Sequence, residues 1–395
     1  MTTPHSAGPQ ALGYLFQARR ALFVILLAPE GSDIVIEGLD DIALTHSSGQ
    51  LNLEQLKHHV TTVADLTDSS SDLWKTIRIW SSALALGAIN IASTTLSLLT
   101  TGTAADDSIG AMLRDGDGRN ERLALERLRT VATTSQNVSL QPSFDSFSSL
   151  TSDQQESLVT AIRVLDSATD IIGLEAKLRE RLRFSTQPQF VSAVRERLEG
   201  WWYSRVAEQL VNGSTDPIPQ LRVHEMVIEI AAQYRDDSLP ITFLDSLPPT
   251  LDPDADDRLF VRQLREITAS NERIEYAIVD YYRAFEQRAQ WVRDDLLIDS
   301  DLEAYENRLC DELHRHRLAL QDELTVDESD AAACKSFGLK LYNWAQITDL
   351  PIRPRVTESY VTRGSFHMLA NCDEPELRVW WHPLFLDRLR AAVER

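Results

Sequence analysis

The first hundred residues combine helical and strand-like hydrophobic patterns that predict a small mixed domain. Residues 11–27 are apolar on most faces and end at Pro29, which predicts a largely buried helix. Three short strand-like runs follow at 32–37, 40–45 and 51–57. The connections between these runs are short and of turn type, so we expect an antiparallel meander.

An amphipathic helix and a fourth strand complete this predicted domain. From Leu73 to Leu84, apolar residues recur at helical spacing, and several residues that can act as N-caps precede them. Residues 95–101 are apolar and β-branched, and we expect them to form a strand packed under that helix. The expected order is therefore one helix, three strands, a second helix and a fourth strand.

The pattern beyond about residue 105 is almost wholly helical. Helical runs are predicted near 118–132, 152–166, 169–184, 188–211, 219–235, 258–296, 301–324 and 328–346. Residues 237–257 hold four prolines among aspartates, which is typical of a linker or a domain boundary. We therefore expect an α+β, mainly α-helical protein, with an α/β domain at 1–130, a helical connecting region at 131–250 and a helical C-terminal domain at 251–395.

Composition adds two restrictions to this picture. The chain of 395 residues has 60 acidic against 39 basic side chains and a formal net charge of −21, so it should be repelled by nucleic acid unless it is brought there. The three cysteines are scattered and make neither a disulfide framework nor a CxxC pair, which favours a reducing cytoplasm. Serine, threonine and asparagine interrupt the most membrane-like stretch, 83–103, and no membrane helix is expected.

Acidic and amide side chains gather where the first three predicted strands meet. Glu37, Asp40 and Asp41 lie at the junction of the first and second strands. Gln55 and Lys57 close the third strand, and they share one face because side chains alternate along a strand. These residues therefore form the most promising chemical site in the sequence.

The arrangement suits hydrolysis of a phosphodiester bond with a divalent metal. Mg²⁺ prefers hard oxygen ligands and keeps several waters, so one or two protein ligands suffice. Asp41 can supply the charged ligand, and the Gln55 amide oxygen and the Leu56 carbonyl can supply neutral ones. Lys57 can then orient a metal-bound water and offset the charge of the transition state. No P-loop, dinucleotide-binding, serine-hydrolase or zincin motif points to another chemistry.

These residues resemble the PD-(D/E)XK nuclease superfamily, in the variant that ends in Gln-X-Lys. Residues 13–17, 37–42 and 55–57 look like the nuclease domain of effectors in cyclic-oligonucleotide antiphage signalling. A similar domain occurs in the nuclease subunit of Lamassu, an ABC-three-component defence system. The resemblance covers roughly the first 100 to 130 residues by motif, and residues 288–309 and 364–383 look like the helical C-terminal domains of such effectors.

The resemblance implies a restriction-endonuclease-like domain with Mg²⁺- or Mn²⁺-dependent activity on DNA, acting as the effector of an antiphage or anti-plasmid complex. It further implies an SMC-like coiled-coil ATPase and a small third subunit as partners. These would hold the nuclease inactive until release lets it self-associate. Because one site cuts one strand, the active form is expected to be at least a dimer, and the resemblance points to a dimer or a tetramer.

The sequence departs from the superfamily pattern at two positions. Many members carry a glutamate where this chain has Gln17 and Gln55, and each replacement removes a negative charge from the metal site. Either Asp40 or Asp41 can be the ligand, and the resemblance favours Asp41, because superfamily patterns place an aliphatic residue such as Ile42 directly after the catalytic aspartate. Glu54 is a nearby carboxylate that could compensate, as could Glu37.

These departures leave a second class of function open. A catalytically degenerate nuclease fold could act as a scaffold that binds partners or DNA ends without cutting. A third class, an effector that disrupts membranes through residues 83–103, would reveal itself by binding to lipid vesicles.

Overall fold

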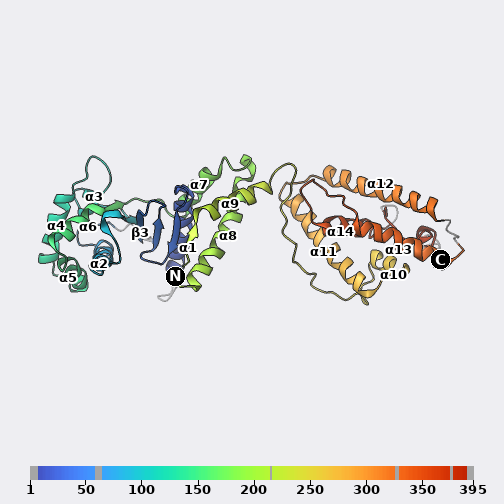
Figure 1. The fold of residues 1–395 in the computed structure, drawn as a ribbon, viewed down its shortest axis with the longest axis horizontal. Coiled ribbons are helices and arrows are strands. Elements are labelled where there is room, and N and C mark those ends of the chain that lie inside the picture. The colour runs from blue at the N-terminus through green and yellow to red at the C-terminus, as the bar shows by residue number, and fades with distance from the viewer. Residues whose placement is uncertain (1–7, 58–64, 214–215, 325–328, 374–376, 389–395) are drawn as a thin grey trace, which may run out of the picture. The chain divides into compact units, whose positions relative to one another are not determined.

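The computed structural model describes residues 8–57, 65–213, 216–324, 329–373 and 377–388 (Figure 1). Its contacts divide the chain into two compact units, Met1–Ala231 and Ala232–Arg395. The expected division had three parts. The structure differs because the helices between residues 131 and 231 belong to the same unit as the sheet. Among the described residues, no helix combines the length and hydropathy of a membrane span.

Six strands form one mixed sheet in the first unit, in the order β5-β4-β3-β2-β1-β6. The strands are β1 (Asp33–Ile36), β2 (Ile42–Thr45), β3 (Leu51–Lys57), β4 (Thr94–Thr100), β5 (Ile162–Leu165) and β6 (Ile218–Pro219). β1, β2 and β3 form the antiparallel meander expected from the sequence, and β4 lies parallel to β3. Helix α2 (Ser71–Ala85) lies in the crossover that such a parallel pair requires. The expected order of helix, three strands, helix and strand is confirmed.

Two strands were not predicted from the sequence. β5 occupies the end of the run predicted as one helix at 152–166, and it pairs in parallel with β4. β6 pairs with β1 just before the helix expected from residue 219. The helical prediction was wrong at β5, because a short apolar run with β-branched residues fits a buried strand as well as a helix. The helix expected from residue 219 is present as α9 (Gln220–Ala232), directly after β6.

Helices cover both faces of the sheet (Figure 1). On one side lie α2 and the helices α3 (Ile109–Met112), α4 (Glu121–Thr134), α5 (Gln141–Ser148) and α6 (Ser152–Ala161), with short 3-10 turns at Ile91–Ser93 and Val138–Leu140. Trp74 of α2 packs edge-on against Phe144 of α5, with ring centroids 4.6 Å apart. This buried aromatic contact fixes α2, whose first turn faces the candidate site.

The other face carries α1 (Gly8–Leu27), α7 (Ile171–Leu182), α8 (Val191–Val211) and α9 (Gln220–Ala232), with a 3-10 turn at Pro188–Phe190. Buried polar contacts fix α1 to α8. The Trp202 indole donates to the Ala18 carbonyl at 2.7 Å, and Arg19 pairs with Glu199 at 2.5 Å. Because these groups are buried, each hydrogen bond prevents an unsatisfied polar atom in the core.

One buried amide ties β1 to the chain just before β6. Gln209 of α8 accepts a hydrogen bond from the Ile36 N–H at 2.9 Å and donates to the carbonyls of Ile34 and Asp216, at 3.3 and 2.7 Å. The Gln209 side chain therefore bonds both β1 and the residue two positions before β6. In this way it supports the pairing of these two strands.

The second unit is a helical domain made of α10 (Leu259–Glu266), α11 (Asn271–Arg293), α12 (Asp299–Glu323), α13 (Ala331–Ile347) and α14 (Ser359–Leu369). Its core includes Phe260, Leu341, Phe366 and Trp381, which are buried. Helix α14 was not predicted as a separate element, although residues 364–367 within it were singled out by resemblance. α14 packs along α11 where Gly364 lets the two backbones come close.

The proline-rich segment 237–257 is part of the second unit, where it is bonded to α11 and is not a free linker. Gln287 of α11 is fully buried, and its amide oxygen accepts from the Thr242 and Phe243 N–H groups at 2.7 and 3.2 Å. Trp291 donates to the Pro240 carbonyl at 2.7 Å. Proline has no backbone N–H, so a segment rich in proline cannot form a regular backbone ladder. Its remaining backbone groups are bonded by side chains of α11 instead.

Candidate functional site

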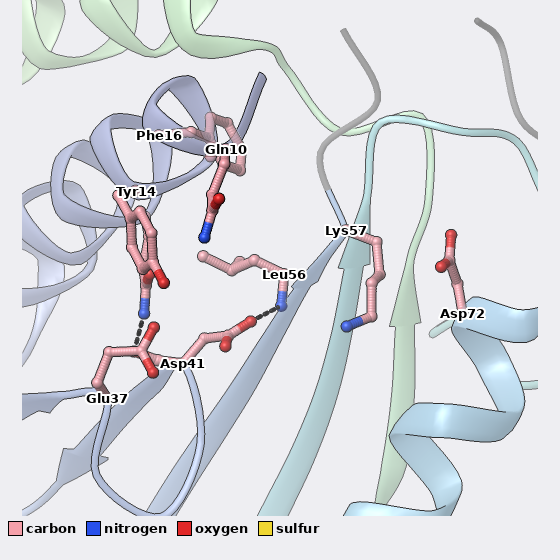
Figure 2. Close-up of a pocket in the computed structure, with 10 residues that line it drawn as sticks. Gln10, Tyr14, Phe16, Glu37, Asp41, Leu56, Lys57 and Asp72 are labelled. Atoms are coloured by element: carbon pink, nitrogen blue, oxygen red, sulfur yellow. Dashed lines mark hydrogen bonds between the residues drawn. The ribbon is translucent and has the colours of Figure 1, made fainter. Parts of the chain in front are cut away.

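A pocket of about 410 Å³ lies where α1, the turn before β2, the end of β3 and the start of α2 meet (Figure 2). It is lined by Gln10, Gly13, Tyr14, Phe16, Gln17, Glu37, Asp41, Leu56, Lys57 and Asp72. Of the residues proposed from the sequence, Glu37, Asp41, Leu56 and Lys57 therefore line one cavity. We call this cavity the site pocket.

Asp41 is held in place by hydrogen bonds to both its side chain and its backbone. Its carboxylate oxygen Oδ2 accepts from the Leu56 N–H at 2.6 Å, as Figure 2 shows, and also from the Gln55 amide nitrogen. Its carbonyl accepts from the Gln17 amide at 2.6 Å. β3 thus holds the Asp41 carboxylate and α1 holds its backbone at the pocket wall, and this is the kind of rigid support that a metal ligand needs.

The strand register explains why Leu56 meets Asp41. β2 begins at Ile42, which pairs with Glu54, so Leu56 extends beyond the end of β2. The Lys57 carbonyl accepts from Thr101 on the β4 side, so the backbone groups of Leu56 point to the β2 side, where Asp41 lies. The alternation predicted for β3 is confirmed, because Leu56 packs with Phe16 while Gln55 faces Asp41.

Glu37 enters the pocket from a tight turn. Its φ of 55° lies in the left-handed region, and its N–H donates to the Asp41 carbonyl at 3.1 Å. A residue other than glycine in this conformation carries backbone strain of about 1–3 kcal/mol, which is common where a side chain must be aimed at a site. The Glu37 carboxylate is exposed at the pocket mouth.

Lys57 and Asp72 lie on the side of the pocket that faces away from α1 (Figure 2). Lys57 is the last residue of β3 and is half-buried. Within the described part of the chain, its ammonium group forms no hydrogen bond or close ion pair. Lys57 is therefore a cation that a bound anion can approach.

Asp40 and Glu54 lie outside the site pocket. Asp40 is buried, with one carboxylate oxygen accepting from the Trp80 indole at 2.6 Å and the other from the Asp41 N–H at 3.0 Å. Arg20 binds both carboxylate oxygens of Glu54 at 2.9 Å. Of the two aspartates that the sequence left open, the structure places Asp41 at the pocket, and Glu54 is engaged elsewhere.

The buried Asp40 makes folding stability depend on pH. Burial raises the pKa of the Asp40 carboxyl from 3.8 to about 6, against the hydrogen bonds from Trp80 and Asp41 that lower it. The folded state then binds this proton more tightly than the unfolded state. The stabilisation is fully present below pH 4 and is lost as the pH rises through 6.

We expect Asp40→Asn to remove this dependence, because the amide keeps an acceptor for Trp80 and does not titrate. The free energy of unfolding of the wild type should fall relative to the variant by on the order of 3 kcal/mol between pH 4 and pH 7. Urea unfolding at several pH values measures this difference. If the free energy of unfolding changed with pH in the same way for both proteins, folding would not raise the pKa of Asp40, and the prediction would be wrong.

The oxygen donors at Asp41 fit a hard divalent cation. The carboxylates of Asp41 and Glu37 line the same pocket, and the Leu56 carbonyl lies on the edge of β3 that faces Asp41. This small number of protein ligands is sufficient for Mg²⁺, because the ion keeps several of its water ligands. Gln55 presents its amide nitrogen to Asp41, so the predicted ligand atom, its amide oxygen, does not face Asp41; a half-turn of the amide would exchange the two.

The described residues contain no group of three or more His, Cys, Asp or Glu side chains placed to hold a metal. A cation in the site pocket would therefore rely on two carboxylates and a backbone carbonyl. Sequence reasoning also missed Asp72 as a lining residue. The sequence feature that could have indicated Asp72 is its position in the first turn of α2, two residues after the N-cap Ser70.

Comparison with known families gives a match in the second unit. Residues 260–389 match the family model of C-terminal domain 7 of the ABC-three component (ABC-3C) systems. The chain is a component of an ABC-3C defence system. Membership of such a system implies partner subunits. The matched residues begin in α10 and contain α11, α12, α13 and α14, so the match concerns the helical unit and not the unit that holds the site pocket.

Solved structures similar to this ABC-3C component include Cap4 SAVED/CARF-domain containing receptors. The receptor of Acinetobacter baumannii with the cyclic trinucleotide 3′3′3′-cAAA is 13% identical, with a TM-score of 0.34, over 68% of this chain and 58% of that one. The Moraxella osloensis receptor is 14% identical, with a TM-score of 0.33, over 70% and 68%. The chain thus spans less than two thirds of the first of these. No curated protein matches the sequence.

Proposed function

We propose that this ABC-3C component is a metal-dependent DNA endonuclease, with the site pocket as its active site. The observation that carries the proposal is that Asp41, Glu37 and Lys57 line one pocket at the end of β3. The preceding α1 and the following α2 and β4 surround it in the order expected for a restriction-endonuclease-like core. Two carboxylates that can hold a divalent cation, and a lysine that forms no ion pair within the described residues, suit metal-assisted hydrolysis of a phosphodiester.

Each residue has a distinct role in this proposal. Asp41, with Glu37 and the Leu56 carbonyl, would hold Mg²⁺ or Mn²⁺, which when bound polarises a phosphate oxygen and lowers the pKa of a water. Hydrogen bonds from Leu56 and Gln55 keep the Asp41 carboxylate oriented. The Lys57 ammonium attracts the phosphodiester and offsets the negative charge that develops in the transition state.

The acidic charge of the chain supports a nuclease that is inactive on its own. A net charge of −21 opposes standing contact with DNA, so activity would depend on recruitment or assembly. We propose that an SMC-like coiled-coil ATPase and a small third subunit hold this component inactive through its helical C-terminal domain. Release would let it form a dimer or tetramer, in which paired sites cut both strands.

Metal binding tests the site before any activity is known. We expect Mn²⁺ to raise the melting temperature of the wild type, because a ligand that binds only the folded state stabilises it by about 2.7 kcal/mol at one hundred times its dissociation constant. Asp41→Asn should abolish the shift. The matched control is Asp40→Asn, which changes the adjacent carboxylate outside the pocket and should keep the shift. Equal shifts in both variants would refute the metal site.

The alternative function is a scaffold with a degenerate nuclease fold. It is favoured by Gln17, which occupies a position where many superfamily members have a glutamate and whose amide here is bound to the Asp41 carbonyl. A protein that shows no Mn²⁺ shift, and no cleavage when it is purified with its native partners, would fit the scaffold and exclude the nuclease.

A further inference from the structure

Two further cavities near the site pocket are lined by residues of α1 and α7. The first, of about 310 Å³, shares Phe16 with the site pocket. The second, of about 400 Å³, shares Lys177 with the first. We call the two together the α1–α7 groove, and the residues that define it are Phe16, Arg20, Phe23, Leu27, Lys177, Arg181, Arg183 and Phe184. The groove thus borders the proposed active site at Phe16.

One face of α1 forms a wall of this groove. Phe16, Arg20, Phe23 and Leu27 recur at steps of four, three and four residues, which places them on one side of the helix. From Gly13 in the site pocket to Leu27, α1 rises about 21 Å at 1.5 Å per residue. That length corresponds to about six nucleotides at 3.4 Å per nucleotide along one strand.

The opposite wall concentrates positive charge in an otherwise acidic protein. Lys177, Arg181 and Arg183 line the groove, and all three are exposed. Two carboxylates also line the groove, Asp166 and Glu180. Asp166 is paired with Arg114 at 2.5 Å, and Glu180 lies 3.7 Å from Arg183, so both are partly neutralised. This patch is positively charged, whereas the chain as a whole carries a net charge of −21. An anion is therefore attracted to this patch, although the chain as a whole repels it.

An exposed aromatic ring stands at the far end of the groove. Phe184 is 86% exposed, and the Arg183 guanidinium lies over its ring, 4.5 Å from the centroid. A large apolar ring in water, beside a cation, is the arrangement on which nucleic-acid bases stack in proteins that bind single strands. An acidic peptide would satisfy the cations but would leave this ring without a partner.

We propose that the α1–α7 groove binds a single-stranded polynucleotide that continues into the site pocket. Lys177 and Arg183 contact its phosphates, and Phe184 stacks on a base. The site pocket is itself lined by Glu37, Asp41 and Asp72, so a polyanion needs cations away from the cut position to stay bound. This inference rests on the nuclease function proposed above and adds that the strand to be cut at each site is held unpaired from its complement.

The test is fluorescence anisotropy of a labelled single-stranded DNA oligonucleotide with the full chain carrying Lys57→Ala, in EDTA and at low salt. Adding Lys177→Ala and Arg183→Ala should reduce the slope of log affinity against log salt by about 1.4, because each lost phosphate contact removes about 0.7 for a single strand. Adding Phe184→Ala alone should weaken binding about tenfold through lost stacking. Duplex DNA of the same sequence should bind more weakly and be insensitive to Phe184→Ala.

The matched control replaces two exposed arginines on the other side of the sheet, with Arg78→Ala and Arg122→Ala, and should bind as the parent does. Absence of binding by the parent, or equal binding by the Lys177 and Arg183 variant, overturns the proposal. So does displacement of the DNA by an acidic peptide with unchanged binding after Phe184→Ala.

The design separates this inference from the function on which it rests. Binding is measured without metal and without Lys57, so it does not require cleavage. Groove-dependent binding in a protein that never cuts would refute the nuclease alone. Cleavage by the wild type that ignores Lys177 and Arg183 would refute the groove alone.

Discussion

Replacing Lys57 with alanine is expected to reduce Mg²⁺-dependent cleavage of plasmid DNA by about 10²–10³-fold, the usual effect of removing one group that stabilises transition-state charge. The side chain is half-buried at the pocket, and its ammonium forms no hydrogen bond within the described part of the chain. The change therefore removes a charge without breaking a hydrogen bond within the described residues. Cleavage should be measured with the chain alone at high concentration and again with its co-purified partners.

A matched lysine separates a catalytic role from a general effect of charge. Lys75 is exposed on α2, and Lys75→Ala removes the same charge from the same unit. We expect this control to cut at the wild-type rate. An equal loss in both variants would contradict a specific role for Lys57, and insolubility of Lys57→Ala would indicate that the residue supports the fold.

The largest effect on stability is expected from Gly364→Ala in the helical domain. A Cβ at this position would overlap the Asp280 carbonyl oxygen and the Ala284 side chain of α11. Backbone atoms cannot give way as a flexible side chain can, so α14 would have to move off α11, at a cost of about 3 kcal/mol. The nearby pair between Arg363 and Asp280, at 2.5 Å, would be disturbed by the same movement.

Hydrogen exchange measured by mass spectrometry can assign this loss to the correct unit. Peptides from α11 and α14 should exchange faster in the variant, while peptides from the sheet should not change. Gly200→Ala is the control, because a Cβ there meets nothing within 4 Å and the residue lies inside α8. That change should stabilise the protein by up to about 1 kcal/mol. Unaltered exchange in α11 after Gly364→Ala would mean that the close approach is not needed.

Local patterns predicted the part of the sheet that is built from neighbouring segments. The meander β1–β3, the crossover α2 and β4 follow from alternation, turns and helical spacing within about 70 residues. β5 and β6 could not be found in this way, because each is a short run that becomes a strand only when a distant edge is available. Local patterns also could not predict that the chain forms two units, because the division depends on which helices share a hydrophobic core.

The candidate site shows the same limit. Strand alternation indicates that Gln55 and Lys57 share a face, but it does not show which of two adjacent aspartates in a turn faces a pocket. That choice depends on Trp80, which takes Asp40 into the core from a helix forty residues away. The Lys177 patch was likewise invisible in the average charge of the chain, because burial and pairing decide which charges are available.

The distant origin of β6 has a consequence for synthesis. β1 lies near the start of the chain, yet its outer neighbour arrives only with Ile218 and Pro219, and Gln209 must be present to bond the strand. A nascent chain that stops near residue 130 would expose both edges of the sheet, because β5 is missing as well. The proposed nuclease unit therefore matures late on the ribosome, when more than half of the protein has been made. Truncation mutants of its first third should be trapped by chaperones or degraded, and should not be toxic.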